Sequence, residues 1–413
     1  MIERGPSGVV LAGAAALGAY QIGVLDHLVT HVAPALDAGL GLEVLSGTSA
    51  GAIHAAALAS NIDDPGAAVA KMRAAWTSLR LDEMLRPSAI ELLSMLSELA
   101  GRPERIHRIL QALGARGGLV DPRPVARLAA QAVDRVAIGE HLRRRRLAGV
   151  AVSATEVATG RATVFHQARH PPAVSGAVMV PVELAPEHVL ASASMPVLFP
   201  AVAIGGELYC DGGLRQMVPL SPALHLGARR VLVVSAVARI DDDAFAGAAR
   251  RAAVASPLYL AGKALDALFS DGVESDLDRL RQVNRLLDAG TRRYGAGFAA
   301  SLDRDLASVG APPVRPIDAV HLQPSRDLGA LAAAYVASDD FARRARGATS
   351  RAFRCVAGDN GARGGGLLAY LLFDGGFAAQ LIDLGHDDAR ARHDELVALF
   401  AQDVRALPVR TQG

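Results

Sequence analysis

The sequence predicts an α/β fold in which helices cover both faces of a mostly parallel central sheet. Short apolar runs rich in β-branched residues alternate with helical stretches over about the first 240 residues. Such runs are typical of strands that are buried on both faces. Two of them lead into loops of small residues, at 13–18 and 47–51, each followed by a helical pattern. With 413 residues, of which 51% are apolar, the chain can form a large core without disulfide or metal staples.

Each expected strand is a short apolar segment that ends near a turn signal. The expected strands are 9–12, 43–46, 147–154, 162–166, 202–204, 208–210, 230–237 and 319–322. Gly205 and Gly206 separate two of them and predict a hairpin. The apolar segment that follows Arg4 also resembles a secretory signal peptide. We prefer to interpret it as a strand, because a strand there fits the group of motifs described below.

Helical patterns occupy most of the remaining chain. Helices are expected over 19–30, from 51 to about 60, and several times within 65–135. Asp121, followed by Pro122 and Pro124, predicts the N-cap and first turn of a helix over 125–133. From residue 328 onwards we expect helix throughout, with Gly385 as a helix stop and Asp387 as the next N-cap.

The C-terminal part of the chain differs from the rest in its pattern. Beyond residue 240, apolar residues recur at helical spacing; they are Leu258, Leu265, Leu268, Leu277, Leu280, Val283 and Leu287. We therefore expect an α/β core over 1–240 and a mainly helical C-terminal extension over 241–413. One late strand, 319–322, interrupts this extension.

Composition and charge exclude several classes of protein. The chain has 43 basic and 42 acidic residues, for a net charge of +1, so we expect no nucleic-acid partner and no strong attraction to an anionic membrane. Cys210 and Cys355 form no CxxC pair, and we expect neither a metal site nor a cofactor. No run is long enough for a membrane-spanning helix. Lys71 and Lys263 are the only lysines, which indicates coding bias; we expect a bacterial protein, cytoplasmic or peripheral to a membrane.

Residues 47–51, GTSAG, match the G-x-S-x-G pattern of a strand–turn–helix elbow that exposes a nucleophilic serine. Ser49 is the candidate nucleophile. The free N–H of Ala50, at the start of the following helix, can stabilise a developing oxyanion. The alternative is an ordinary strand–helix loop with an unreactive serine.

A serine hydroxyl needs a base to accept its proton. Asp211 is the candidate base, because it stands at a strand end and precedes Gly212 and Gly213. The alternative is an aspartate that only forms a turn.

The loop 13–18 supplies further N–H groups for an oxyanion hole, at Gly13, Ala14 and Ala15. Its glycines echo a phosphate-binding loop, but the full G-x-G-x-x-G and P-loop patterns are absent. We therefore do not expect nucleotide binding.

The ordered blocks around these residues resemble the patatin-like phospholipases. They are the strand and loop at 9–23, the elbow at 47–51, the stretch ASASMP at 191–196 with Phe199 and Pro200, and DGG at 211–213 followed by VPL at 218–220. The resemblance implies a three-layer α/β/α core and hydrolysis of lipid acyl esters without a metal. It implies a Ser49–Asp211 dyad that uses no histidine, with Gly13, Ala14 and Ala15 at the oxyanion positions. It also implies a lipid or acyl-ester substrate and transient contact with a membrane surface.

The loop departs from the family pattern, which resembles three glycines, a variable residue, Arg or Lys, and glycine. Ala14 and Ala15 replace the second and third glycines, and Leu17 replaces the basic residue. If the loop needs a positive φ, alanine there costs about 1–2 kcal/mol. A catalytically weak lipid-binding or scaffold protein of the same fold is therefore an alternative function, and the missing charge favours less polar substrates.

Other features have a structural and a functional interpretation. Ser49, Asp211 and His321 follow the chain order of an α/β-hydrolase triad, which is a rival mechanism. We expect His54 and Cys210 to be packing residues. The basic run 143–146 is expected to be a solvated helix end, with binding to anionic lipid as the alternative. The apolar run 367–373 is expected to be a helix–helix core, with a lid over the pocket as the alternative.

Overall fold

A nine-stranded sheet forms the middle layer of the computed structural model. The structure describes residues 5–37, 39–84, 121–171, 178–196, 198–236, 273–309, 314–345, 347–357 and 365–401. The strands are β1 (Ser7–Leu11), β2 (Val44–Thr48), β3 (Gly149–Glu156), β4 (Ala162–Ala168), β5 (Val178–Pro181), β6 (Val202–Ile204), β7 (Glu207–Asp211), β8 (Arg230–Val234) and β9 (Asp318–Leu322).

The sheet is mostly parallel, as the sequence predicts. Its main path runs β5-β4-β3-β2-β1-β8-β9. Strands β3, β2, β1, β8 and β9 are parallel neighbours, whereas β4 is antiparallel to β3. All residues of β1, β2 and β8 are buried. Strands covered on both faces in this way explain the uninterrupted apolar runs in the sequence.

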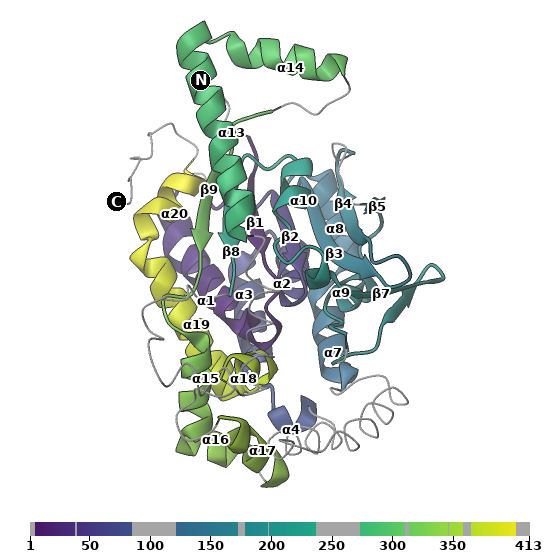
Figure 1. Ribbon diagram of the computed structural model, residues 1–413, viewed down its shortest axis with the longest axis vertical. Coiled ribbons are helices and arrows are strands. Elements are labelled where there is room, and N and C mark those ends of the chain that lie inside the picture. The colour runs from purple at the N-terminus through teal and green to yellow at the C-terminus, as the bar shows by residue number, and fades with distance from the viewer. Residues whose placement is uncertain are drawn as a thin grey trace, which may run out of the picture.

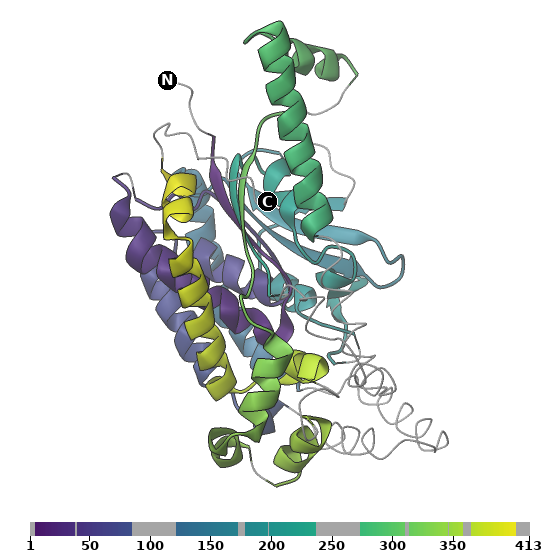
Figure 2. The ribbon, with the colours of Figure 1, turned by 60° about the vertical axis from the view of Figure 1, so that its left-hand side comes forward.

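Helices cover both faces of this sheet (Figures 1 and 2). On one face lie α1 (Ala19–His27), α2 (Ala50–Ser60), α3 (Pro65–Thr77), α19 (Gly375–Ala391) and α20 (His393–Phe400); on the other lie α10 (Leu220–His225) and α13 (Val273–Tyr294). The expected three-layer α/β/α arrangement is therefore confirmed.

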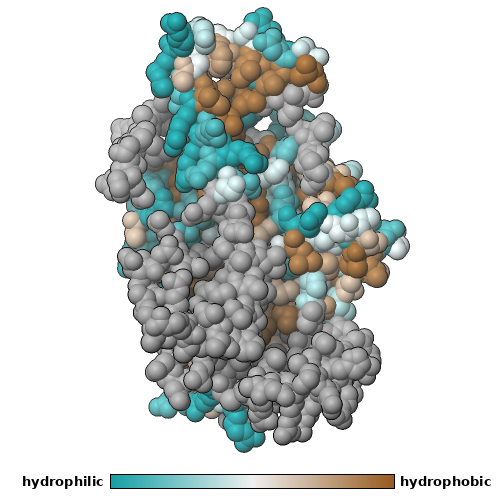
Figure 3. Space-filling model, in the orientation of Figure 1, coloured by the Kyte–Doolittle hydropathy of each residue, from teal (hydrophilic) through white to brown (hydrophobic). Residues whose placement is uncertain are grey.

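Further short helices complete the layers and the two ends of the molecule. They are α4 (Leu81–Met84), α7 (Pro122–Ala132), α8 (Arg135–Arg143), α9 (Pro186–Ser192), α14 (Phe298–Ser308), α15 (Leu328–Ala337), α16 (Asp339–Arg344), α17 (Gly347–Ala357) and α18 (Gly365–Leu371). α13 and α14 project beyond the sheet (Figure 1). Apolar side chains are exposed on this projection (Figure 3), among them Leu286, Tyr294 and Val309.

Local sequence signals explain several boundaries. The Asp121 side chain accepts a hydrogen bond from the Arg123 N–H and caps α7, which begins at Pro122. Gly205 and Gly206 both adopt positive φ, 59° and 91°, as the tight hairpin between β6 and β7 requires. Both predictions are confirmed.

The prediction that Gly385 stops a helix is wrong. α19 continues through Gly385 because this glycine allows close packing against α1: a Cβ there would lie 2.1 Å from the Tyr20 carbonyl oxygen. Gly23 on α1 has the same role, since its Cβ would lie 1.8 Å from the Ile382 carbonyl oxygen. The missing side chains let the two helix backbones approach, and this need outweighs the low helix propensity of glycine.

Two other expectations differ from the structure in detail. The helix expected over 19–30 ends at His27 and continues as a π-helical turn, η2 (Leu28–Val32). The expected helices within 85–120, and the apolar spacing at Leu258, Leu265 and Leu268, lie outside the described residues. The division of the chain at residue 240 stays a prediction, although β9 extends the same sheet beside β8.

In the part of the chain that the structure describes, no helix combines the length and apolar character needed to cross a membrane.

Packing between α1 and α19 generates a test on stability. Gly23→Ala introduces a methyl group against the Ile382 carbonyl, and we expect a loss of about 1–3 kcal/mol or more in the free energy of unfolding. That loss exceeds the gain of about 1 kcal/mol in helix propensity. Gly139→Ala in α8 is the matched control, since nothing lies within 4 Å of its Cβ position, and it should be neutral or stabilising. Urea unfolding measures both; equal stability of the two variants would contradict the packing argument.

Candidate active site

Ser49 occupies a strained turn between β2 and α2. Its φ is 56° and its ψ is −124°, a conformation that costs a non-glycine residue about 1–3 kcal/mol. The flanking glycines allow this turn. A Cβ at Gly47 would lie 2.2 Å from the Gly51 carbonyl oxygen, and one at Gly51 would lie 2.1 Å from the Leu11 carbonyl oxygen. The small residues of the GTSAG segment therefore form the elbow that the sequence predicts.

Asp211 ends β7, and its carboxyl group is held on one side only. The Gly213 N–H donates to Oδ1 at 2.7 Å. The main chain of Asp211 is fixed as well: its N–H donates to the Ser194 carbonyl at 2.9 Å, and its carbonyl accepts from the Thr155 hydroxyl at 2.9 Å. Gly212 is required because a Cβ there would lie 2.1 Å from the Ser153 carbonyl oxygen.

The structure brings Ser49 and Asp211 together. Both side chains are buried, and the Ser49 side chain lies close enough to the Asp211 carboxyl to lower its pKa. Among the described residues, no hydrogen bond of standard geometry joins the two side chains, and Oδ2 of Asp211 has no partner. Burial raises the pKa of Asp211 from 3.8 to about 6, while the contacts with Ser49 and Gly213 lower it in part. A carboxyl group with this pKa can accept a proton near neutral pH.

Backbone N–H groups of two segments lie near this pair. Within the described part of the chain, the structure gives no hydrogen bond to the N–H of Ala14, Ala15 or Ala50. Ala15 adopts a φ of 46°, so the loop does need a positive φ, and it needs it at an alanine. The prediction that Gly13 contributes to the oxyanion hole is wrong. Its N–H donates to the Met217 carbonyl at 2.9 Å and is not free to bind an oxyanion.

Two residues that hold the elbow and the loop after β1 in place are not predicted by the sequence motifs. The Ser192 hydroxyl accepts from the Ser49 N–H at 3.0 Å and donates to the Ser153 carbonyl at 2.6 Å, which ties the elbow to β3. Gln21 donates to the Ala12 carbonyl at 2.7 Å and so supports the loop after β1. Ser192 lies in the ASASMP stretch, which offered a signal; Gln21 offered none.

An apolar cavity opens at Ser49. It has a volume of about 30 Å³ and is lined by Ala15, Ser49 and Ala50 together with apolar side chains such as Leu198, Phe199 and Phe373. A larger cleft of about 670 Å³ shares Ile53, Trp76, Leu79, Met84 and Leu128 with this cavity. The two spaces therefore adjoin, with these five side chains between them.

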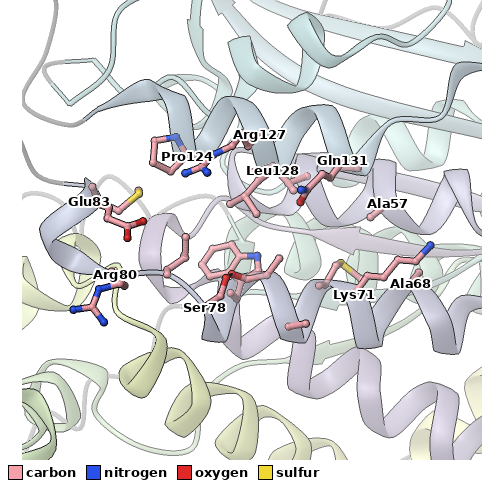
Figure 4. A pocket seen from close by; sticks show the side chains of 18 of the residues that line it. Ala57, Ala68, Lys71, Ser78, Arg80, Glu83, Pro124, Arg127, Leu128 and Gln131 are labelled. Atoms are coloured by element: carbon pink, nitrogen blue, oxygen red, sulfur yellow. Dashed lines mark hydrogen bonds between the residues drawn. The ribbon is translucent and has the colours of Figure 1, made fainter. Parts of the chain in front are cut away.

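The larger cleft lies between α3 and α7 (Figure 4). Arg80 and Glu83 lie towards one end of it, and Lys71 lies towards the other. Three cations, Lys71, Arg80 and Arg127, and one carboxylate, Glu83, line the cleft among mainly apolar residues. The cleft can therefore hold an amphipathic molecule with an anionic group.

The rival triad with His321 is wrong for this structure. His321 lies on β9, which β1 and β8 separate from β2; three strand spacings amount to about 14 Å. Its Nε2 pairs with the Ser235 hydroxyl at 2.8 Å. Burial lowers the pKa of His321 to about 4, so this imidazole is neutral and has no contact with the Ser49–Asp211 pair.

His54 and Cys210 pack as expected. His54 is buried, its Nδ1 pairs with Gln21 at 2.9 Å, and burial lowers its pKa to about 3. Burial and the neighbouring Asp211 raise the pKa of the Cys210 thiol, which makes it a poor nucleophile.

The basic run and the late apolar run also follow the expected structural interpretation. Residues 143–146 are exposed at the end of α8, where Arg146 pairs with Asp63 at 3.0 Å. Residues 368–373 are buried, and of these Phe373 reaches the cavity at Ser49. This segment is thus part of the core rather than a separate cover.

Comparison with known proteins identifies one family. A family model described as patatin-like phospholipase matches residues 9–224. A search of curated proteins gives no match. Among solved structures the chain is similar to VipD from Legionella pneumophila, with 14% sequence identity and a TM-score of 0.30; the match covers 92% of this chain and 67% of that chain. A TM-score this low carries no argument about this chain.

The raised pKa of Asp211 predicts a pH-dependent stability. A carboxyl group whose pKa is higher in the folded state stabilises that state below the unfolded pKa, and the stabilisation is lost as the pH rises through the folded pKa. For a shift from 3.8 to about 6, the ionised carboxylate thus destabilises the fold by about 3 kcal/mol above pH 6, at about 1.36 kcal/mol per unit. The neutral variant Asp211→Asn should gain up to this amount at about pH 8 and nothing below about pH 4.

Urea unfolding at the two pH values measures the gain. Asp288→Asn, which removes an exposed carboxylate on α13, is the control and should show no such gain. A gain for Asp211→Asn that is the same at both pH values would contradict the burial argument.

Proposed function

The chain belongs to the patatin-like phospholipase family, and from this premise we propose that it hydrolyses carboxylic esters of lipids through an acyl-enzyme on Ser49, with Asp211 as the base. Membership of this family supports lipid acyl hydrolysis as the general activity of the chain. The observation that carries the finer proposal is the proximity of the buried Asp211 to Ser49, which lines an apolar cavity.

The first half-reaction transfers the acyl group to the serine. Ionised Asp211 accepts the Ser49 proton while Oγ attacks the ester carbonyl carbon. The N–H groups of Ala50, Ala14 and Ala15 stabilise the negative oxygen that develops there. The C–O bond to the alcohol then breaks, and the alcohol leaves with the proton held by Asp211.

The second half-reaction releases the acid. Asp211 takes a proton from water, whose oxygen attacks the carbonyl carbon of the acyl-enzyme. Collapse of this intermediate breaks the bond to Ser49 Oγ, and the serine recovers its proton. The products are a carboxylic acid and an alcohol, and no metal takes part in these steps.

The cavities support a lipid substrate. The small cavity beside Ser49 suits an apolar group next to the ester, since its lining offers almost no polar partners. The adjoining cleft carries Lys71, Arg80 and Arg127 against one carboxylate, so the rest of the substrate fits there, with a phosphate group as one candidate head group. A lipid ester of this kind implies transient contact with a membrane surface.

A weakly active scaffold of the same fold is the second candidate function, and the loop favours it. Alanine at the positive φ of residue 15 raises the cost of forming the oxyanion hole by about 1–2 kcal/mol. The two functions differ in one property, because only a hydrolase contains an activated serine.

Substitution of Ser49 tests the nucleophile. We expect Ser49→Ala to lower kcat on p-nitrophenyl esters and phospholipids by about 10⁴-fold or more and to abolish labelling by a fluorophosphonate probe. His321→Ala is the matched control and should keep both activities. Circular dichroism checks that both variants are folded. Turnover in Ser49→Ala, or a wild-type chain that the probe does not label, would overturn the proposal.

The pH dependence of kcat/KM tests the base. Since Asp211 must be ionised and burial raises its pKa to about 6, kcat/KM should rise about tenfold per unit below pH 6 and level off above it. Asp211→Asn should remove the activity at every pH. If His321→Ala, rather than the Asp211 variant, removed the acidic limb, the base would be a histidine.

A further inference from the structure

Four of the histidines meet at one place, at the far end of α1 from the elbow. His27 ends α1, His31 lies on the π-helical turn η2, His386 lies on α19 and His393 begins α20. The centroid of the His27 ring lies 4.8 Å from the centroid of the His31 ring, 5.1 Å from that of His386 and 5.4 Å from that of His393. The cluster therefore joins segments from the two ends of the chain.

Helix geometry explains why the rings lie together. His27 and His31 are four residues apart, so they lie on one face of a helix, and their rings stack with an interplanar angle of 11°. The close approach of α1 and α19 at Gly23 and Gly385 brings His386 to the same face, where its ring stands edge-on to both other rings.

Each of three imidazoles uses one ring nitrogen in a hydrogen bond. His386 Nδ1 pairs with Asp26 Oδ2 at 3.0 Å. His31 Nδ1 pairs at 2.7 Å with the Thr30 hydroxyl, which itself donates to the Asp26 carbonyl at 2.6 Å. His27 Nε2 pairs with His393 Nδ1 at 3.2 Å.

The remaining nitrogen of each ring is free to accept a ligand. Nδ1 of His27 is buried without a partner. Within the described residues, the structure gives no hydrogen bond to Nε2 of His31 or His386. A buried nitrogen without a hydrogen-bond partner lowers the stability of the fold. A hydrogen bond to one ring nitrogen fixes the tautomer of the imidazole, and the lone pair of the other nitrogen can then bind a metal.

We propose that His27, His31 and His386 form a binding site for a divalent transition metal of the Zn²⁺ type. One nitrogen of each lies within 4.8 Å of one nitrogen of the other two. A tetrahedral Zn²⁺ site with Zn–N bonds of about 2.0–2.1 Å needs nitrogens about 3.4 Å apart, so small side-chain rotations close the site. Imidazole ligands favour Zn²⁺, Cu²⁺ and Ni²⁺ over Mg²⁺ and Ca²⁺.

Charges of both signs surround the proposed site. Asp26 provides the carboxylate behind His386 that metal-bound histidines usually have. Arg73, which pairs with Asp26 at 3.1 Å, and Arg390 oppose the cation. His31 is exposed, which leaves a coordination position open to water.

The position of the site assigns it a structural role. α1 begins next to the loop at Ala15 and runs away from Ser49 for nine residues, or about 13 Å, before it ends at His27. A metal there cannot touch the ester, but it connects α1 to α19. The inference therefore does not depend on the proposed hydrolase function.

Metal titration tests the site. Chelator-treated full-length protein is titrated with Co²⁺, whose visible spectrum reports coordination by nitrogen ligands, and with Zn²⁺ in competition. We expect one equivalent to bind and the Tm to rise by a few degrees at saturating Zn²⁺. His31→Ala should lower the affinity at least tenfold and abolish the rise in Tm. This variant should fold normally, because His31 is exposed.

Two controls make the test specific. His170→Ala removes an exposed histidine elsewhere and should bind Co²⁺ as the wild type does. Asp26→Asn, behind His386, should weaken binding about 10–100-fold. Absence of binding in the wild type, or equal affinity of His31→Ala and His170→Ala, would overturn the proposal. Esterase activity is not used as a readout, so failure of this site would not affect the proposed function.

Discussion

Close backbone packing around Ser49 is the constraint on which the site depends. Gly47, Gly51 and Gly212 each lie against a carbonyl oxygen at a distance that admits no side chain. This packing holds Ser49 in a strained conformation and brings β7, with Asp211 at its end, against β3. The strain costs about 1–3 kcal/mol, and only a large rigid core can offset it. The large apolar core around the sheet thus stabilises the strained conformation of a small polar site.

The polar groups of the site are held by backbone contacts rather than by a chain of charged residues. Asp211 has its N–H, its carbonyl and one carboxyl oxygen fixed by Ser194, Thr155 and Gly213. Its other oxygen has no standard partner within the described residues, which leaves it free for a proton. Burial of a carboxylate that is satisfied on one side only raises its pKa, so the same geometry that destabilises the fold favours the role proposed for Asp211.

The C-terminal helices complete the core instead of lying apart from it. α19 packs on α1 through glycines on both helices, and Phe373, just before α19, lines the cavity at Ser49. The helix that carries part of the histidine cluster at its far end thus begins beside the loop 13–18. A clamp between α1 and α19 would hold this helix, and with it the loop, without any contact with the substrate.

Much of the fold could be predicted from the sequence, because strand runs, the GTSAG elbow, the Gly205–Gly206 hairpin and the cap at Asp121 depend on residues that are close together in the chain. The order of motifs also indicated Ser49 and Asp211 as a pair. What the tertiary structure decided were contacts between distant segments. The Met217 carbonyl accepts the hydrogen bond from the Gly13 N–H, and α1 packs so closely on α19 that position 385 must be glycine. His386 lies beside His27 and His31 although more than 350 residues separate them in the chain. A local pattern records the preference of a residue for a conformation, but not which distant group will occupy its hydrogen bond or press against its Cα.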